Sequence, residues 1–217
     1  MGKHAERMER FRRAGLYLVT GEPLSAGRST PEIVGQALEA GVRLVQLREK
    51  QKSKRELFRL ACRLRERCEH YGALLIIDDH LDVALASGAD GVHLGTEDLP
   101  PGAARALFPE GIIGVSTHNL EQAGAAADSG ASYYNIGPIF PTRTKSWSEA
   151  FLGPGAIPEL SAGCPLPFTV MGGIKRDNIE QVLAAGARTV AVVTAVTAAP
   201  DPAEACRDLL EMVRRYR

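Results

Sequence analysis

LLIIDD, at residues 74–79, decides the fold: four apolar residues, two of them β-branched, run directly into the carboxylates of Asp78 and Asp79. The same pattern of an apolar run followed by polar residues recurs in VQLREK (45–50), GVHLGTED (91–98) and GVSTH (114–118). Continuous apolar runs are typical of parallel strands that are buried on both faces. The loops that follow such strands carry the chemistry of parallel α/β folds, so the polar residues after these runs are expected to meet at one rim.

Eight such runs are spread along the chain and alternate with helical patterns. Short segments such as EAGV (39–42) and AAGA (184–187) place a glycine just past a predicted helix. Helices commonly end at a residue in the left-handed conformation, which glycine adopts readily. The repeat of roughly 25 residues predicts one (β/α)8 barrel over residues 1–217, with residues 1–14 as a short helical extension. An open doubly wound sheet is the alternative, but it would not bring so many loops to one place. The predicted strands are Leu16–Thr20, Leu44–Leu47, Leu74–Ile77, Gly91–Leu94, Ile112–Val115, Tyr133–Ile136, Phe168–Val170 and Thr189–Val193.

Local signals place several helix starts. Thr30 is predicted to cap a helix that begins with Pro31, a residue tolerated at the first helical position. Ser53 precedes a helix over 54–70, in which apolar residues recur at helical spacing. The remaining helices are predicted at 80–86, 101–107, 120–127, 154–160, 176–185 and 202–216.

Composition restricts the partners. Lysine and arginine number 26, as do aspartate and glutamate, so no overall charge favours nucleic acid or an anionic membrane. No apolar run approaches the length that crosses a bilayer, and the first residues lack the apolar segment of a signal peptide. Four cysteines without C-x-x-C spacing indicate reduced thiols in a cytoplasmic protein.

Basic residues end the second predicted strand. Gln46, Arg48 and Lys50 alternate, so their side chains share one face. An arginine and a lysine on that face can hold phosphate oxygens. The alternative is a solvated run of charges, as in the EKQKSKRE stretch that follows.

Acidic residues follow the third and fourth predicted strands. Asp79 and Asp98 could supply the one or two carboxylates that Mg²⁺ needs beside phosphate oxygens and water. Helix capping is the alternative for both residues, and for Ser116 as well. His118 is a candidate proton-transfer group, whereas His93 lies in a buried strand and is interpreted as a hydrogen-bonded core residue.

The segment PIFPTRTK, at 138–145, combines stiffening prolines with two hydroxyls and an ammonium group. Thr142, Thr144 and Lys145 together suit an oxyanion. Glycines at 172–173 and the pair Val193–Thr194 follow the seventh and eighth runs. Barrels often bind phosphate with these two loops.

In this order, VQLREK, the acidic pair after LLII, GVHLGTED, GVSTH, GPIFPTRTK, GGI and AVVTAV resemble thiamine phosphate synthase over about residues 16–210. The resemblance implies a Mg²⁺-dependent transferase that joins a pyrimidine methyl diphosphate to a thiazole phosphate and releases pyrophosphate. It implies Asp79 and Asp98 as metal ligands, and small-molecule substrates rather than a macromolecule; a homodimer would be unsurprising. Catalytic roles fall on Arg48, Lys50, Ser116 and Lys145. The implied substrate-binding residues are Gln46, Leu47, Arg48, Glu49, Lys50, Asp78, Ser116, Thr142, Arg143, Thr144, Lys145, Gly173, Val193 and Thr194.

The sequence departs from the family at Asp78, where asparagine is usual. An additional carboxylate repels a diphosphate unless a metal or a proton neutralises it. Two rival functions follow: a thiazole tautomerase that uses His118, and a phosphate-binding barrel without turnover. The retained Arg48, Asp79 and Asp98 favour the synthase.

Overall fold

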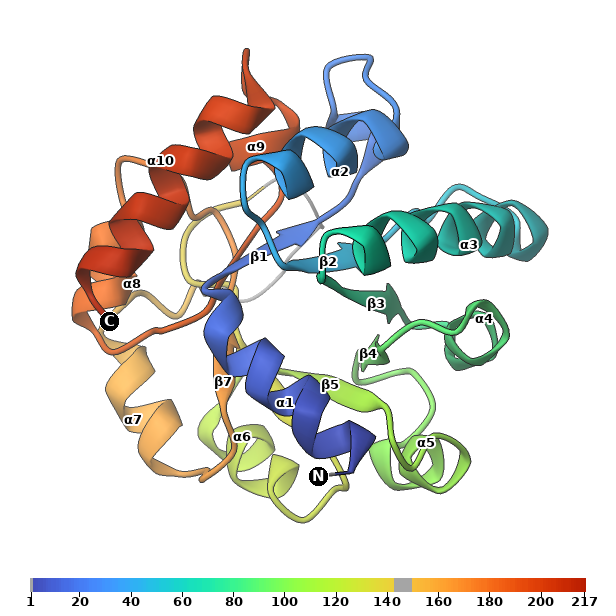
Figure 1. The fold of residues 1–217 in the computed structure, drawn as a ribbon. Coiled ribbons are helices and arrows are strands. Elements are labelled where there is room, and N and C mark those ends of the chain that lie inside the picture. The colour runs from blue at the N-terminus through green and yellow to red at the C-terminus, as the bar shows by residue number, and fades with distance from the viewer. Residues whose placement is uncertain (1, 143–149) are drawn as a thin grey trace.

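A computed structural model describes residues 2–142 and 150–217 of the chain. Eight parallel strands pair in sequence order, and β8 returns to β1, so the sheet closes into a barrel (Figure 1). The predicted (β/α)8 fold is therefore confirmed. The strands are β1 (Leu16–Val19), β2 (Leu44–Leu47), β3 (Leu74–Asp78), β4 (Gly91–Leu94), β5 (Ile112–Thr117), β6 (Tyr133–Ile136), β7 (Phe168–Val170) and β8 (Val190–Val192).

Helices surround the barrel and follow its strands along the chain (Figure 1). Two elements were not predicted, the short helices η1 after β1 and α9 after β8, because each has too few residues to show a helical period. The helices are α1 (Lys3–Ala14), η1 (Glu22–Leu24), α2 (Thr30–Glu39), α3 (Lys54–His70), α4 (Leu81–Ser87), α5 (Pro101–Leu107), α6 (Leu120–Ala126), α7 (Ala156–Ala162), α8 (Ile179–Ala184), α9 (Thr194–Thr197) and α10 (Pro202–Arg215).

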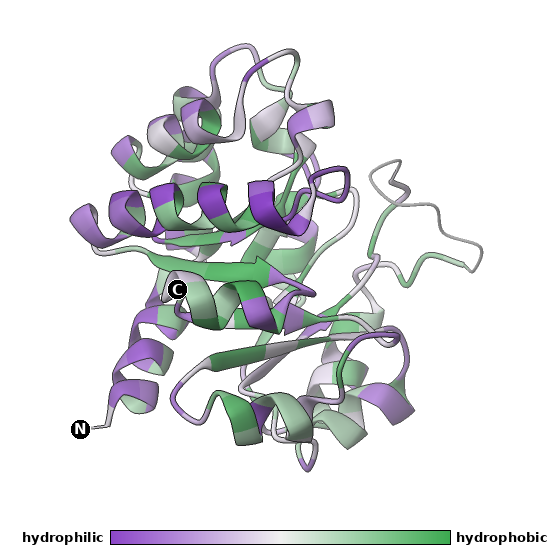
Figure 2. Ribbon diagram, turned by 90° about the vertical axis from the view of Figure 1, so that its right-hand side faces the viewer, coloured by the Kyte–Doolittle hydropathy of each residue, from purple (hydrophilic) through white to green (hydrophobic). Residues whose placement is uncertain are grey.

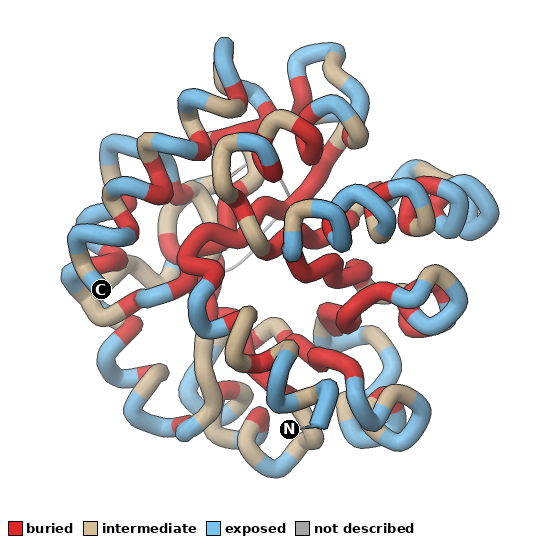
Figure 3. Tube along the Cα trace, viewed as in Figure 1, coloured by how far each residue is buried: buried red, intermediate tan, exposed pale blue. Residues whose placement is uncertain are grey.

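Apolar side chains form two layers. The larger lies between strands and helices, and the smaller fills the barrel interior. The strands are hydrophobic and buried, while the helices turn polar, exposed faces outward (Figures 2 and 3). Successive strand residues alternate between the layers: Leu75 belongs to the outer layer, and Leu74 and Ile76 to the inner one. This alternation fixes which polar residues can face the barrel axis.

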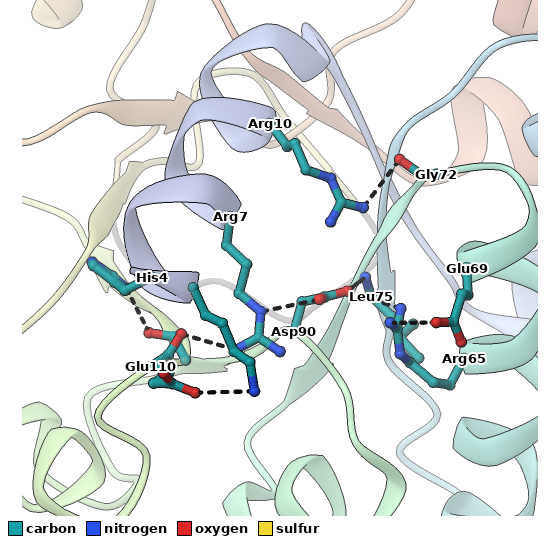
Figure 4. A network of polar contacts seen from close by, with 11 residues as sticks. His4, Arg7, Arg10, Arg65, Glu69, Gly72, Leu75, Asp90 and Glu110 are labelled. Atoms are coloured by element: carbon teal, nitrogen blue, oxygen red, sulfur yellow. Dashed lines mark hydrogen bonds and ion pairs between the residues drawn. The ribbon is translucent and has the colours of Figure 1, made fainter. Parts of the chain in front are cut away.

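Helix α1 covers the end of the barrel where the strands begin (Figure 1). Met8, Phe11 and Ala14 are buried in the inner apolar layer. Polar contacts hold the helix in place, because Arg7 Nε donates to Asp90 Oδ1 at 3.2 Å and Arg7 Nη1 donates to the Glu110 carbonyl at 2.9 Å (Figure 4). The predicted helical extension thus closes one end of the barrel.

Asp90 is the centre of these contacts. Its side chain is 3% exposed and lies 3.2 Å from a guanidinium nitrogen of Arg65 as well as from Arg7 (Figure 4). The backbone N–H of Leu75 also donates to Asp90, at 2.9 Å. A buried carboxylate is tolerated when charges and donors surround it in this way.

The structure tests the predicted helix caps at Ser53 and Thr30. The predicted start at Ser53 is confirmed by a full capping box with Glu56. The predicted cap at Thr30 is wrong: Ser29 precedes the helix, and the Thr30 hydroxyl instead donates to Glu49 Oε1 at 2.6 Å. Thr30 is the first residue of the helix and not its cap, and its hydroxyl proton makes a charge-assisted hydrogen bond to the buried carboxylate.

Within the described ranges, no helix is long and apolar enough to span a membrane. All four cysteines are unpaired, as predicted, and all but Cys62 are buried.

Candidate active site

A pocket opens where the strands end, opposite to α1. Most of the residues singled out in the sequence line it, although they come from six different strands or the loops after them. They are Gln46, Arg48, Lys50, Asp78, Asp79, Ser116, Thr142, Gly173, Val193 and Thr194, joined by His93 and His118. The convergence predicted from the strand-end pattern is therefore confirmed.

Strand β2 and its continuation supply the basic side chains. Gln46, Arg48 and Lys50 face the pocket, as their alternation predicts. Leu47 lies in the outer apolar layer, and Glu49 is buried, accepting hydrogen bonds from the hydroxyls of Thr20 (2.8 Å) and Thr30 (2.6 Å). The side chains of Leu47 and Glu49 thus face away from the pocket, because the alternation that turns their neighbours inward turns them outward. Their assignment as substrate-binding residues stays a prediction.

Lys50 lies between two carboxylates. Its Nζ is 2.8 Å from Asp78 Oδ2 and also contacts Asp79, while Arg48 Nε is 3.6 Å from Asp78. Burial, together with the charge of Asp79, raises the pKa of Asp78 to about 6 despite the nearby cations. Burial opposes ionisation of Asp79 too, but the hydrogen bond and charge of Lys50 leave the pKa of Asp79 below its ordinary value. Two cations and two carboxylates therefore face one another in the pocket.

Asp79 lines the pocket, and Asp98 lies beside Asp79 but is not one of the lining residues. Asp79 has a φ of 60°, in the left-handed region, and its side chain shares a hydrogen bond with Asp98. Asp98 Oδ2 also accepts from the N–H of Gly95 at 2.6 Å. Burial, and then the charge of Asp79, outweigh that N–H and raise the pKa of Asp98. Neither residue caps the helix that follows it.

Two carboxylates in hydrogen-bond contact need a shared proton or a cation between them. Oxygen ligands of this kind suit Mg²⁺, which takes one or two carboxylates and completes its shell with phosphate oxygens and water. The pair therefore fits the predicted metal. Among residues 2–142 and 150–217, no three or more His, Cys, Asp or Glu side chains gather as a metal site.

Ser116 is part of strand β5, so the capping alternative is wrong; Asn119 caps the following helix. The Ser116 Oγ lies 3.0 Å from Nε2 of His93, and Nδ1 of the same ring lies 2.8 Å from the Tyr133 hydroxyl. His93 is thus a hydrogen-bonded core residue, as interpreted, and burial lowers its pKa to about 4. Sequence reasoning missed Tyr133 and Tyr17, whose only signal was a hydroxyl within an apolar run.

The opposite side of the pocket is built from loops. Gly173 has a φ of 64°, and a Cβ there would lie 2.4 Å from the Pro141 carbonyl oxygen, so only glycine fits. His118 Nδ1 lies 2.6 Å from the Gly137 carbonyl oxygen. Thr142 lines the pocket, whereas Arg143, Thr144 and Lys145 lie outside the described residues.

Comparisons with known proteins agree on one family. The family model described as thiamine monophosphate synthase matches residues 16–196. The chain is 38% identical to a thiamine-phosphate synthase of Caldicellulosiruptor saccharolyticus, covering 97% of this chain and 96% of that protein. It is 43% identical to one of Shouchella clausii, covering 90% and 94%. Thiamine phosphate pyrophosphorylase from Pyrococcus furiosus has a similar structure, with a TM-score of 0.87, 35% identity, and coverage of 96% and 98%.

Proposed function

The chain belongs to the thiamine monophosphate synthase family, and on that premise we propose that its pocket joins a pyrimidine methyl diphosphate to a thiazole phosphate. The carbon–oxygen bond to the diphosphate breaks, the thiazole nitrogen bonds to the freed methylene carbon, and pyrophosphate leaves. The family's relatives and the strand-end pocket support this activity. The observation that carries it is that Arg48, Lys50 and Ser116 line the same pocket.

Charge stabilisation is the main task of the proposed site. Negative charge grows on the leaving diphosphate, and preorganised cations in a partly buried pocket stabilise it. Arg48 and Lys50 would do so from the end of β2, with Ser116 as a hydroxyl partner and Gln46 and Asp78 beside the pyrimidine diphosphate. Lys145 is proposed for the same task. The reaction asks for no protein nucleophile, so positioning the two substrates is the rest of the catalysis.

Mg²⁺ is proposed to bind Asp79 and Asp98, which share a hydrogen bond and offer only oxygen ligands. When bound, it would add positive charge beside the diphosphate oxygens. The metal would also offset the repulsion between the negative charges of the two carboxylates. Lys50, already in contact with Asp79, would then be freer to turn to the substrate.

The thiazole phosphate is proposed to bind opposite, at Thr142, Gly173, Val193 and Thr194, with Arg143 and Thr144. The close packing of Gly173 on the Pro141 carbonyl gives this wall a fixed shape. Leu47 and Glu49 would contribute through the backbone, since their side chains face outward. We propose further that residues 1–217 act as one domain, in the cytoplasm and as a homodimer.

The deciding experiment measures pyrophosphate release by the purified protein with both substrates, with and without Mg²⁺. Release that needs all three components is the expected result. Release without the thiazole phosphate would indicate simple hydrolysis and contradict the coupling reaction. A change in the ultraviolet spectrum of the thiazole carboxylate phosphate alone would instead indicate a tautomerase that uses His118.

A further inference from the structure

We propose that Gln46, Tyr17, Tyr133 and His93 form a directional hydrogen-bond relay inside the barrel, which fixes the hydroxyl of Ser116 as a donor into the pocket. The inference deepens the proposed function and rests on it for the identity of the acceptor. Its structural part, the direction of the hydrogen bonds, holds for the free protein and can be tested without any substrate.

The relay is continuous through the barrel interior. Gln46 Nε2 lies 2.8 Å from the Tyr17 hydroxyl, which lies 3.0 Å from the hydroxyl of Tyr133. The Tyr133 hydroxyl is 2.8 Å from Nδ1 of His93, and Nε2 of that ring is 3.0 Å from Ser116 Oγ. These five residues come from β1, β2, β4, β5 and β6, so no local stretch of sequence contains the relay.

The donor and acceptor groups of these side chains set the direction of the hydrogen bonds in the relay. An amide nitrogen can only donate, so Gln46 gives a hydrogen bond to the Tyr17 oxygen. Tyr17 has a single hydroxyl proton, which it gives to Tyr133, and Tyr133 gives its own to Nδ1 of His93. A neutral imidazole that accepts at Nδ1 carries its proton on Nε2. That N–H donates to Ser116 Oγ, and the proton of Ser116 is left to point elsewhere, into the pocket.

Burial keeps the relay in one state. Gln46, Tyr17, Tyr133 and His93 are each at most 6% exposed. The Phe11 ring of α1 lies 4.4 Å from the Tyr133 ring, centroid to centroid. On the other side, a Cβ at Gly114 would lie 2.2 Å from the Tyr133 ring, so this glycine makes the space that the ring occupies. With its partners closely packed, each hydroxyl has its position set by the next group in the relay.

The direction matters because of what the pocket is proposed to bind. Diphosphate oxygens only accept hydrogen bonds, so a serine whose proton were held by His93 would offer them a lone pair and repel them. A serine that accepts from His93 offers its proton instead. Tyr17, Tyr133 and His93 are therefore positioning residues, and Ser116 is the group that meets the substrate.

The first test reads the tautomer of His93 by ¹⁵N NMR of the free protein, with His93→Gln to assign the ring signals among the five histidines. A proton on Nε2 is the expected result. A proton on Nδ1 would overturn the proposal, because His93 would then donate to Tyr133 and accept from Ser116, whose proton would no longer point into the pocket. This outcome is independent of whether the protein has synthase activity.

The second test is a double-mutant cycle on kcat/KM for the pyrimidine diphosphate. Tyr133→Phe removes the donor to His93 and is expected to lower kcat/KM about ten-fold or more, the worth of one hydrogen bond to a charged group. In a Ser116→Ala background the same change is expected to cost nothing further, because Tyr133 acts only through Ser116. Losses that multiply in the double variant would contradict the relay.

Tyr134→Phe is the matched control. Tyr134 is the next residue of β6, is equally buried, and gives its hydroxyl to the Leu160 carbonyl at 3.4 Å in the helix layer. Its loss is expected to leave kcat/KM within about two-fold of the unchanged protein, since it has no part in the relay. Tyr17→Phe, which leaves the Tyr133–His93 hydrogen bond in place, is expected to cost less than Tyr133→Phe; an equal or larger loss would count against the direction.

Discussion

Lys50 Nζ lies 2.8 Å from Oδ2 of Asp78, a carboxylate at the position where the family resemblance implies asparagine. The same ammonium group also contacts Asp79, so in the free protein two carboxylates hold the cation that is proposed to meet the diphosphate. Substrate and metal must compete with this arrangement. The additional carboxylate of this chain therefore bears on both affinity and stability.

Asp78→Asn is expected to leave turnover intact or raise it, and to lower KM for the pyrimidine diphosphate, because it removes a buried charge that repels the substrate and occupies Lys50. Steady-state kinetics at saturating Mg²⁺ measure both quantities. A collapse of turnover would show that this chain uses the second carboxylate in catalysis.

The same substitution predicts a pH dependence of stability. Because burial raises the pKa of Asp78 to about 6, the folded protein binds a proton more tightly than the unfolded chain does. The penalty for ionised Asp78 is therefore full above pH 6 and disappears as the pH falls toward the ordinary pKa of aspartate, about 4. Asp78→Asn is expected to stabilise the fold by about 1–2 kcal/mol at pH 7 and by less at pH 5. Urea unfolding at the two pH values tests the sign.

Arg48→Ala is expected to lower turnover by about 100-fold or more, because it removes a preorganised cation from the proposed diphosphate site. Arg55→Ala, at an exposed position of α3, is the matched control and should have no effect. Equal turnover rates for the two variants would contradict the assignment of Arg48 to the diphosphate site.

Asp98→Asn is expected to raise the Mg²⁺ concentration needed for half-maximal turnover by about ten-fold or more, since it removes one of two carboxylate ligands. The exposed neighbour Glu97 offers a control of equal charge change, Glu97→Gln, for which the titration should not move. Coinciding Mg²⁺ titrations for Asp98→Asn and Glu97→Gln would contradict the metal assignment.

Gly173→Ala and Gly153→Ala separate backbone strain from close packing. Both glycines have positive φ, 64° and 70°, and each alanine should cost about 1–2 kcal/mol for that reason. Of the two, only Gly173 has a close neighbour: an added Cβ would lie 2.4 Å from the Pro141 carbonyl oxygen. Gly173→Ala should therefore lower the free energy of unfolding by roughly a further 1–3 kcal/mol and weaken binding of the thiazole phosphate. Chemical unfolding and calorimetric titration measure the two effects. Equal behaviour would show that the wall at Gly173 can move.

Asp90→Ala is expected to destabilise the fold by about 3–5 kcal/mol, because Arg7 and Arg65 would lose their buried counter-charge and the Leu75 N–H its acceptor. Lys3→Ala removes an exposed pair with Glu110 and should cost less than about 1 kcal/mol. Guanidinium unfolding compares them. A small loss for Asp90→Ala would mean that the other contacts of α1, its apolar face and the hydrogen bond from Arg7 to the Glu110 carbonyl among them, are enough to hold the helix.

Features that depend on short-range periodicity, such as side-chain alternation and helix capping, could be predicted from the sequence alone. Alternation along β2 placed Gln46 and Lys50 on one face, and an apolar run ending in carboxylates predicted a buried strand with Asp79 at its open end. The capping box at Ser53 is equally local. Such features are fixed by side-chain direction over a few residues, so they survive in any fold that keeps the strand or helix.

Which buried polar groups meet depends on the three-dimensional fold. Tyr17 and Tyr133 are 116 residues apart, and their hydrogen bond exists because the barrel closes with this stagger of strands. The Thr30 hydroxyl likewise has a partner that its own turn of sequence does not show, since the fold brings the buried Glu49 within 2.6 Å of it. A buried polar atom takes the strongest partner within reach, and that choice depends on long-range register that no local pattern contains.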